Sequence, residues 1–181
     1  MLEKEIKILE VNTVEIINRL LDLGAEKIFE GNIKDVYFDF HDNVSNKKQE
    51  AECIYRLRQK GEKNVYTVKH KKQLETDNEK VMVKEEVETG VADFENFSKM
   101  LKMQGMTPIR KKEKHRASYV LGDTAFDFDT YNGIPTILEI EGPSGDKIYS
   151  WIKELLLHEK EHLVGGSRML FDKYKVPYTY C

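Results

Sequence analysis

The sequence has few cysteines and no long hydrophobic run. Cys53 and Cys181 are the only two cysteines among 181 residues, which is too few for a disulfide framework, and their spacing is not that of metal ligands. Residues 3 to 5 are all charged, and no segment approaches the roughly 20 apolar residues that cross a bilayer. We therefore expect a cytoplasmic protein without a membrane partner.

An excess of positive charge is also absent. The chain carries 29 Lys and Arg against 32 Asp and Glu, a net charge of -3, which argues against a nucleic-acid partner bound through overall charge. No low-complexity segment or Pro/Gly/Ser-rich linker interrupts the sequence. The length then fits a single domain spanning residues 1–181.

Glycine-rich phosphate loops are missing as well. Neither a Walker-type motif nor a dinucleotide-binding fingerprint occurs in the chain. If the protein binds phosphate groups, side chains rather than a backbone loop must hold them.

Turn residues and hydrophobic spacing divide the chain into three helices and a series of strands. Helices are predicted at 13–23, 93–105 and 146–160, and residues 167–174 are predicted to form a short helix or a turn. Strands are predicted at 2–8, 26–40, 53–60, 64–71, 80–89, 107–112, 114–121, 124–131 and 136–141. The Asn132-Gly133 pair is typical of a hairpin turn between the last two.

The first strand separates charged from apolar side chains. In Glu3-Lys4-Glu5-Ile6-Lys7, alternation places Glu3, Glu5 and Lys7 on one face, and Ile6 on the other. Such a charged face is costly to bury unless something pairs it.

The same separation recurs along the chain, and it is sorted by the sign of the charge. Acids two positions apart occur at Asp127 and Asp129 and at Glu139 and Glu141; bases occur at Arg56 and Arg58 and at Lys112, Lys114 and Arg116. A flat sheet with its charges in solvent is one explanation. The sorting of charges by sign favours a second explanation, which is a closed β-barrel with ionic side chains inside and helices packed outside.

Clustered carboxylates and clustered bases each need a counterion. All-oxygen ligands select a hard cation such as Mg²⁺ or Mn²⁺, and arginine binds phosphate oxygens with two hydrogen bonds. An interior with both clusters predicts a metal-bound polyphosphate as the ligand.

These residues resemble the CYTH superfamily, the triphosphate tunnel metalloenzymes, whose hallmark E-x-E-x-K strand matches Glu3, Glu5 and Lys7. The resemblance covers nearly the whole chain. It also includes the segments 35–39, 56–58, 86–88, 113–116, 127–129 and 138–142, with Lys69 and Tyr119. It implies an α+β fold, an eight-stranded antiparallel barrel forming a tunnel, and makes a homodimer plausible.

The resemblance also implies roles for individual residues. The metal ligands would be Glu3, Glu5, Asp129, Glu139 and Glu141, with Asp129 a better match than Asp127. The triphosphate would be bound by Arg56, Arg58, Lys69, Lys114 and Arg116. Glu86 and Glu88 would either bind it or balance the positive charge of these bases. Lys7 and Tyr37 would orient or deprotonate the nucleophile, although Tyr37 is equally explained as an ordinary strand aromatic, and the direction of the shift in the pKa of Lys7 stays open.

Three functions are compatible with this resemblance. The first is a metal-dependent hydrolase of inorganic tripolyphosphate, thiamine triphosphate or a nucleoside triphosphate. The second is a class IV adenylate cyclase, which makes cyclic AMP and pyrophosphate from ATP, and the third is a noncatalytic triphosphate-binding module. We favour hydrolysis because water as a nucleophile needs fewer specific contacts than a ribose hydroxyl.

Overall fold

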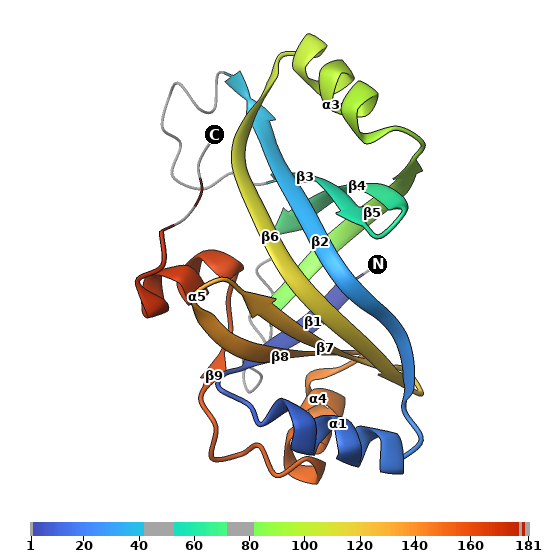
Figure 1. Cartoon of the computed structure of the whole chain (residues 1–181), viewed down its shortest axis with the longest axis vertical. Helices are drawn as coiled ribbons and strands as arrows, with labels where there is room; N and C mark the ends of the chain where they lie inside the picture. Colours follow the sequence, from blue (N-terminus) through green and yellow to red (C-terminus); the bar gives the residue numbers. More distant parts are fainter. Residues whose placement is uncertain (1, 42–52, 72–81, 178, 180–181) are drawn as a thin grey trace.

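The computed structural model describes residues 2–41, 53–71, 82–177 and 179; for residues 2, 3, 71 and 82–84 the description covers the backbone alone. The strands are β1 (Leu2–Ile8), β2 (Glu26–Phe40), β3 (Cys53–Lys60), β4 (Lys63–Lys71), β5 (Met82–Val91), β6 (Met106–Leu121), β7 (Thr124–Tyr131), β8 (Ile134–Gly142) and β9 (His162–Leu163). The helices are α1 (Thr13–Asp22), α3 (Phe94–Met103), α4 (Gly145–Glu154) and α5 (Ser167–Tyr174) (Figure 1).

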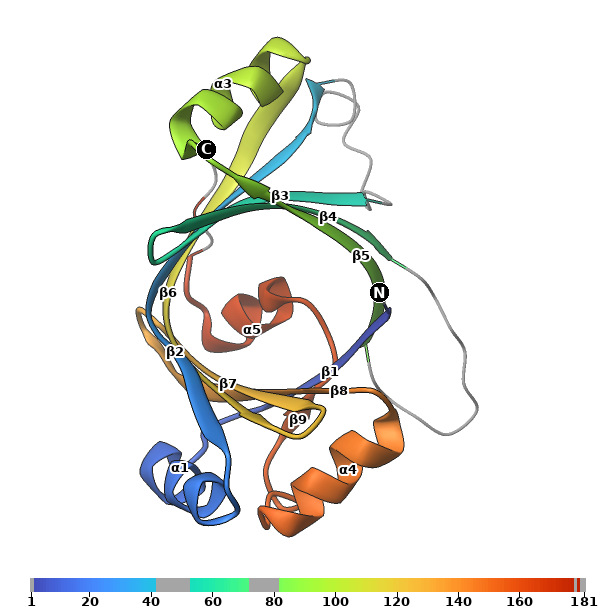
Figure 2. The same cartoon turned by 90° about the vertical axis from the view of Figure 1, so that its right-hand side faces the viewer.

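All nine strands belong to one sheet with the order β5-β4-β3-β2-β6-β7-β8-β1-β9, and every pairing is antiparallel. β1 also pairs with β5, in the register that sets Leu2 opposite Glu85 and Glu5 opposite Met82. The pairings therefore follow one another in a cycle through β1 to β8. Figure 2 shows these strands curving around a common interior.

Three helices cover the apolar outer face of the sheet. Ile16 of α1 and Ile148 of α4 pack with Ile6, Phe126 and Ile140 in the largest core cluster. Leu101 of α3 packs in a second cluster with these residues: Phe38, Leu57 and Met106. Because alternate residues of each strand face this core, the charged residues between them face the interior.

Helix α5 occupies a different place. Leu170 packs with Leu9, Tyr131 and Ile137, and α5 lies over one end of the ring of strands (Figures 1 and 2). The side-chain amine of Lys112 donates to the hydroxyl of Ser167 at 3.2 Å, so the start of α5 contacts the inner face of β6. One end of the interior is therefore bounded by this helix.

The α+β class and the antiparallel order are confirmed, but in the described part of the chain the sheet has nine strands rather than eight. The prediction missed β9, which has two residues and pairs with β1 through Lys7–Leu163 and Ile8–His162. Residues 107–112 and 114–121 form one strand, β6, because Glu113 continues the alternation without a turn residue. Helix α4 ends at Glu154 rather than at 160, since Leu156 adopts a left-handed conformation with φ of 57°. None of the helices in the described ranges is long and apolar enough to cross a membrane.

Candidate functional site

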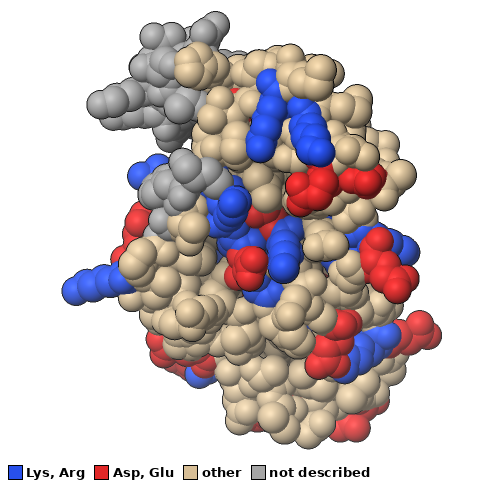
Figure 3. All heavy atoms as spheres, turned by 45° about the horizontal axis from the view of Figure 1, so that its top comes forward, with Lys and Arg blue, Asp and Glu red and all other residues tan. Residues whose placement is uncertain are grey.

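The inner face of the sheet is lined by acids and bases that the strand register places opposite one another. Asp35 lies opposite Arg58, Lys69 opposite Glu86, Arg116 opposite Asp129 and Lys7 opposite Glu139. Figure 3 shows basic and acidic side chains gathered in a depression near the middle of one face. Opposite charges on directly paired residues stabilise a sheet, and here they also fix the orientation of each charged group.

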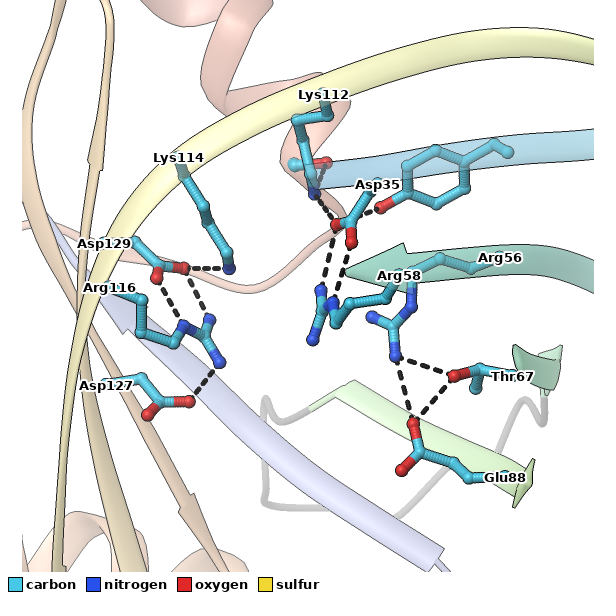
Figure 4. Close-up of polar contacts among 12 residues, drawn as sticks. Asp35, Arg56, Arg58, Thr67, Glu88, Lys112, Lys114, Arg116, Asp127 and Asp129 are labelled. Carbon is cyan, nitrogen blue, oxygen red and sulfur yellow. Dashed lines mark hydrogen bonds and ion pairs between the residues drawn. The ribbon is translucent and has the colours of Figure 1, made fainter. Parts of the chain in front are cut away.

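The first group of side chains surrounds Arg116. Its Nε and Nη2 donate to the carboxylate of Asp129, and Nη1 donates to Asp127 (Figure 4). Nη2 also donates to Glu139. Lys114 donates to Oδ2 of Asp129, the oxygen that also accepts from Nη2 of Arg116. Every nitrogen of the Arg116 guanidinium is therefore engaged by a carboxylate from β7 or β8.

Lys7 connects this group to β1. Its Nζ lies 3.1 Å from Oε1 of Glu5 and 3.1 Å from Oε1 of Glu139, and only 3% of the residue is exposed. Burial lowers the pKa of an ammonium, but Glu139 and Glu5 outweigh that effect and hold the pKa of Lys7 above its ordinary value. Lys7 is thus fixed in its protonated form.

A second group lies on β2, β3 and β6 and is centred on Asp35. Arg58 donates from Nε to Oδ1 at 2.7 Å and from Nη2 to Oδ2 at 2.9 Å, and Nζ of Lys112 lies 3.9 Å from Oδ2 (Figure 4). Burial raises the pKa of this carboxyl, but Arg58 and Lys112 outweigh it and hold the pKa of Asp35 far below its usual range. Asp35 is therefore a permanent negative charge among the basic side chains of β3 and β6.

Tyr37 belongs to the same group. Its hydroxyl donates to Oδ2 of Asp35 at 3.4 Å, and the guanidinium of Arg110 lies over its ring, 3.7 Å from the centroid. Burial raises the pKa of the phenol, but Lys112, Arg56 and Arg110 outweigh burial and lower the pKa of Tyr37 to about 8. This phenol can therefore take up or release a proton near neutral pH.

A third group occupies β3, β4 and β5. Nη2 of Arg56 donates to Thr67 at 3.0 Å, to Glu88 at 3.2 Å and to Glu86 at 3.4 Å, and Lys69 forms an ion pair with Glu86. The Nε of Arg56 is buried and has no hydrogen-bond partner among the residues that the structure describes. In this structure Glu86 and Glu88 therefore pair with the bases Arg56 and Lys69.

Lys114 differs from Lys7 in its electrostatic surroundings. Burial and the neighbouring Arg116 together lower its pKa to about 8, although Asp129 and Glu139 act in the opposite direction. The pKa values of these two buried lysines are thus shifted in opposite directions, because Lys7 contacts two carboxylates whereas Lys114 contacts one and lies beside a guanidinium.

The predicted metal ligands for which the structure describes side chains are Glu5, Asp129, Glu139 and Glu141. Within the described part of the chain, no three His, Cys, Asp or Glu side chains form a group that could hold a metal ion. Asp129 and Glu139 contact Arg116 instead, and Glu5 and Glu139 contact Lys7. Glu141 lies opposite Glu5 in the sheet, and the side chain of Glu3 lies outside the described residues. In this structure the acids Glu5, Asp129 and Glu139 are therefore paired with lysine or arginine side chains.

The structure adds residues to which the sequence reasoning gave no role. Asp35, Thr67, Arg110, Lys112 and Asp127 all contact the predicted site residues. A signal was present for some of them, because Arg110 and Lys112 continue the alternation of Lys114 and Arg116, and Asp35 is two positions before Tyr37. Thr67 carries no charge and gave no such signal.

Comparison with known proteins identifies the family of the chain. The CYTH domain model matches residues 1–168, and the chain therefore belongs to the CYTH domain family. None of the curated proteins compared with the chain matches it.

Solved structures share the fold at low sequence identity. The PH1012 protein from Pyrococcus horikoshii OT3 is 24% identical, with a TM-score of 0.69 over 88% of this chain and 94% of that one. A Vibrio parahaemolyticus protein provisionally assigned as an adenylate cyclase is 17% identical, with a TM-score of 0.74 over 94% and 98%. Hippeastrum HpAC1, reported to have a dominant triphosphatase activity, is 13% identical, with a TM-score of 0.59 over 99% and 90%.

Proposed function

We propose that this protein is a divalent-metal-dependent triphosphatase that hydrolyses inorganic tripolyphosphate or an organic triphosphate, either thiamine triphosphate or a nucleoside triphosphate. The observation that carries this function is the convergence of Arg56, Arg58 and Lys112 on the inner face of two strands that flank β2. Phosphoryl transfer depends mainly on neutralising and positioning phosphate oxygens. We also propose that the cycle of strands β1 to β8 forms the tunnel in which the triphosphate binds.

The chemistry assigned to the described residues follows from their charge states. Water forms a bond to the terminal phosphorus while the bond to the bridging oxygen breaks, which gives orthophosphate and the shortened phosphate. Tyr37, with a pKa of about 8, accepts the proton of the attacking water in its ionised form. Lys7 stays protonated and neutralises charge near the reacting phosphate, which assigns it orientation rather than proton transfer.

We propose that Mg²⁺ or Mn²⁺ enters bound to the triphosphate. Mg²⁺ keeps several waters and usually binds through one or two carboxylates together with substrate phosphates, so a complete protein cage is not needed. Glu5 and Glu141 face each other across β1 and β8, and they are the carboxylates best placed to contact such an ion. Asp129 and Glu139 both pair with Arg116, and Lys7 pairs with Glu5 and Glu139.

A class IV adenylate cyclase is the second candidate. The features that favour it are the 15-residue strand β2 and the helix α5, which resemble the cyclase branch, and the likeness to the Vibrio protein. The Hippeastrum protein favours hydrolysis as the main reaction of such a fold. A noncatalytic triphosphate-binding module is the third candidate.

One assay separates the three candidates. Purified protein with Mg²⁺ or Mn²⁺ is given tripolyphosphate, thiamine triphosphate and ATP in parallel, and orthophosphate, pyrophosphate and cyclic AMP are quantified together. We expect orthophosphate release. Cyclic AMP with pyrophosphate would identify the cyclase, and binding without any product would identify the module. Light scattering of the same sample tests the proposed homodimer.

A further inference from the structure

Asp35 occupies a special place in the register of the sheet. It lies directly opposite Arg58 in the β2–β3 pair and directly opposite Lys112 in the β2–β6 pair. Its neighbour on the same face, Tyr37, is flanked in the same way by Arg56 and Arg110. One acid is thus inserted into a wall of four bases drawn from two strands.

The contacts of Asp35 constrain the orientation of Arg58. Asp35 is 1% exposed, and it accepts hydrogen bonds from Nε and Nη2 of Arg58 at 2.7 and 2.9 Å. A carboxylate that binds two nitrogens of a planar guanidinium fixes the plane of that group as well as its position. The rotation of Arg58 about its last side-chain bonds is therefore set by Asp35.

Arg58 and Arg116 use their guanidinium groups differently. All three nitrogens of Arg116 donate to Asp127, Asp129 or Glu139. Arg58 uses Nε and Nη2 for Asp35, and within the described residues Nη1 has no hydrogen-bond partner. Figure 4 shows this third nitrogen pointing away from Asp35. Arg58 thus presents a free end, its Nη1 nitrogen, whereas all three guanidinium nitrogens of Arg116 already donate hydrogen bonds.

We propose, on the basis of the function proposed above, that Asp35 is a positioning residue for the triphosphate. It holds one edge of Arg58 so that the free end donates to phosphate oxygens in a fixed direction, and it holds Lys112 beside it. Arg116 instead organises the carboxylates of β7 and β8. The triphosphate-binding wall is then made by Arg56, Arg58 and Lys112.

The change Asp35→Asn tests this role. It keeps the shape of the side chain but replaces one acceptor oxygen with a donor that faces Arg58, so the paired contact is lost. We expect kcat for tripolyphosphate to fall by about 10- to 100-fold, while KM does not rise because a negative charge has left the basic wall. Asp22→Asn, which removes the same charge from the exposed end of α1, should leave both constants unchanged.

If the Asp35–Arg58 pair only stabilises the fold, Asp35→Asn should change stability and not kinetics. Asp35→Asn would then lower the melting temperature while the folded fraction kept wild-type kcat and KM, and that result would overturn the assignment. If Asp35→Asn does not fold, Arg58→Lys replaces it, because lysine keeps the charge next to Asp35 but cannot donate from two fixed nitrogens. The same fall in kcat is expected, and an unchanged kcat would again overturn the role.

Two further readouts test whether Asp35 acts through Arg58. In the double variant Asp35→Asn/Arg58→Lys, the loss in kcat should equal that of Arg58→Lys alone, whereas multiplied losses would show independent roles. The Nε–Hε resonance of Arg58 in NMR spectra should be resolved in wild type, broaden in Asp35→Asn, and shift when tripolyphosphate is added to wild type. If wild type hydrolyses nothing, the proposed function fails, while this resonance still reports the orientation. A resonance identical in both proteins would refute the role of Asp35.

Discussion

Lys7 and Glu139 lie directly opposite each other in the β1–β8 pair, and Nζ of Lys7 is 3.1 Å from Oε1 of Glu139. Burial opposes both charges, yet the pKa of Lys7 is raised and that of Glu139 is lowered well below its usual range, because each is surrounded by charges of the other sign. Both groups are therefore ionised across the neutral range. A lysine in this state neutralises charge but does not remove a proton.

The change Lys7→Met removes that ammonium and leaves Glu5 and Glu139 without it. We expect kcat for triphosphate hydrolysis at pH 7 to fall by roughly 100- to 1000-fold, the loss typical of removing one charge-stabilising donor. Lys99→Met, at an exposed position of α3, is the matched control and should retain wild-type turnover. Steady-state kinetics measures both, and an undiminished kcat for Lys7→Met would remove Lys7 from the mechanism.

The pKa of Tyr37 predicts a pH dependence. If its phenolate accepts the proton of water, kcat rises as the pH increases towards about 8 and levels off above that pH, because only the ionised form is active. Tyr37→Phe should lower kcat and abolish this step. Tyr149→Phe, on the exposed side of α4, should keep the wild-type profile. A step of unchanged position and height in Tyr37→Phe would assign the titration to another group.

The contacts of Arg116 predict a large effect on stability. Arg116→Met removes the guanidinium that Asp127, Asp129 and Glu139 share, and removing one partner of a buried ion-pair group costs about 3 to 5 kcal/mol of unfolding free energy. Arg19→Met, which breaks the exposed pair with Glu15, should cost less than about 1 kcal/mol. Urea unfolding followed by circular dichroism measures both values, and equal losses would contradict this assignment of Arg116.

Removal of metal should abolish activity without unfolding the protein. The interior acids for which the structure gives contacts are neutralised by lysines and arginines, so the fold does not depend on a cation. We expect EDTA to stop triphosphate turnover, excess Mg²⁺ or Mn²⁺ to restore it, and the melting temperature to change by no more than about 1 °C when EDTA is added. A large drop in melting temperature would reveal a structural metal site.

Much of the fold follows from the sequence because local signals and periodicity agree in most elements. The prediction for 26–40 matches β2 and that for 53–60 matches β3, since polar or glycine-containing segments bound both runs in the sequence. The exceptions arise from tertiary contacts. β9 is two residues long and exists through its pairing with β1, and α4 stops although its apolar periodicity continues into Leu155 and Leu157.

Less of the candidate site than of the fold could be predicted from the sequence. Alternation correctly predicts which residues share a face, but it does not determine which acid meets which base, because that depends on the register between strands. The register places Asp35 between Arg58 and Lys112. It also brings Asp127 to Arg116, together with two of the expected metal ligands, Asp129 and Glu139.

The central claim is that a triphosphate binds inside the ring of strands, against the basic side chains of β3 and β6. A crystal structure of the protein with tripolyphosphate under conditions that prevent turnover tests it most directly. We predict phosphate oxygens within hydrogen-bond distance of Arg56, Arg58 and Lys112, in the interior bounded by α5. Tripolyphosphate bound on the outer surface, with the Arg58–Asp35 and Arg116–Asp129 pairs enclosing an interior without phosphate, would contradict it.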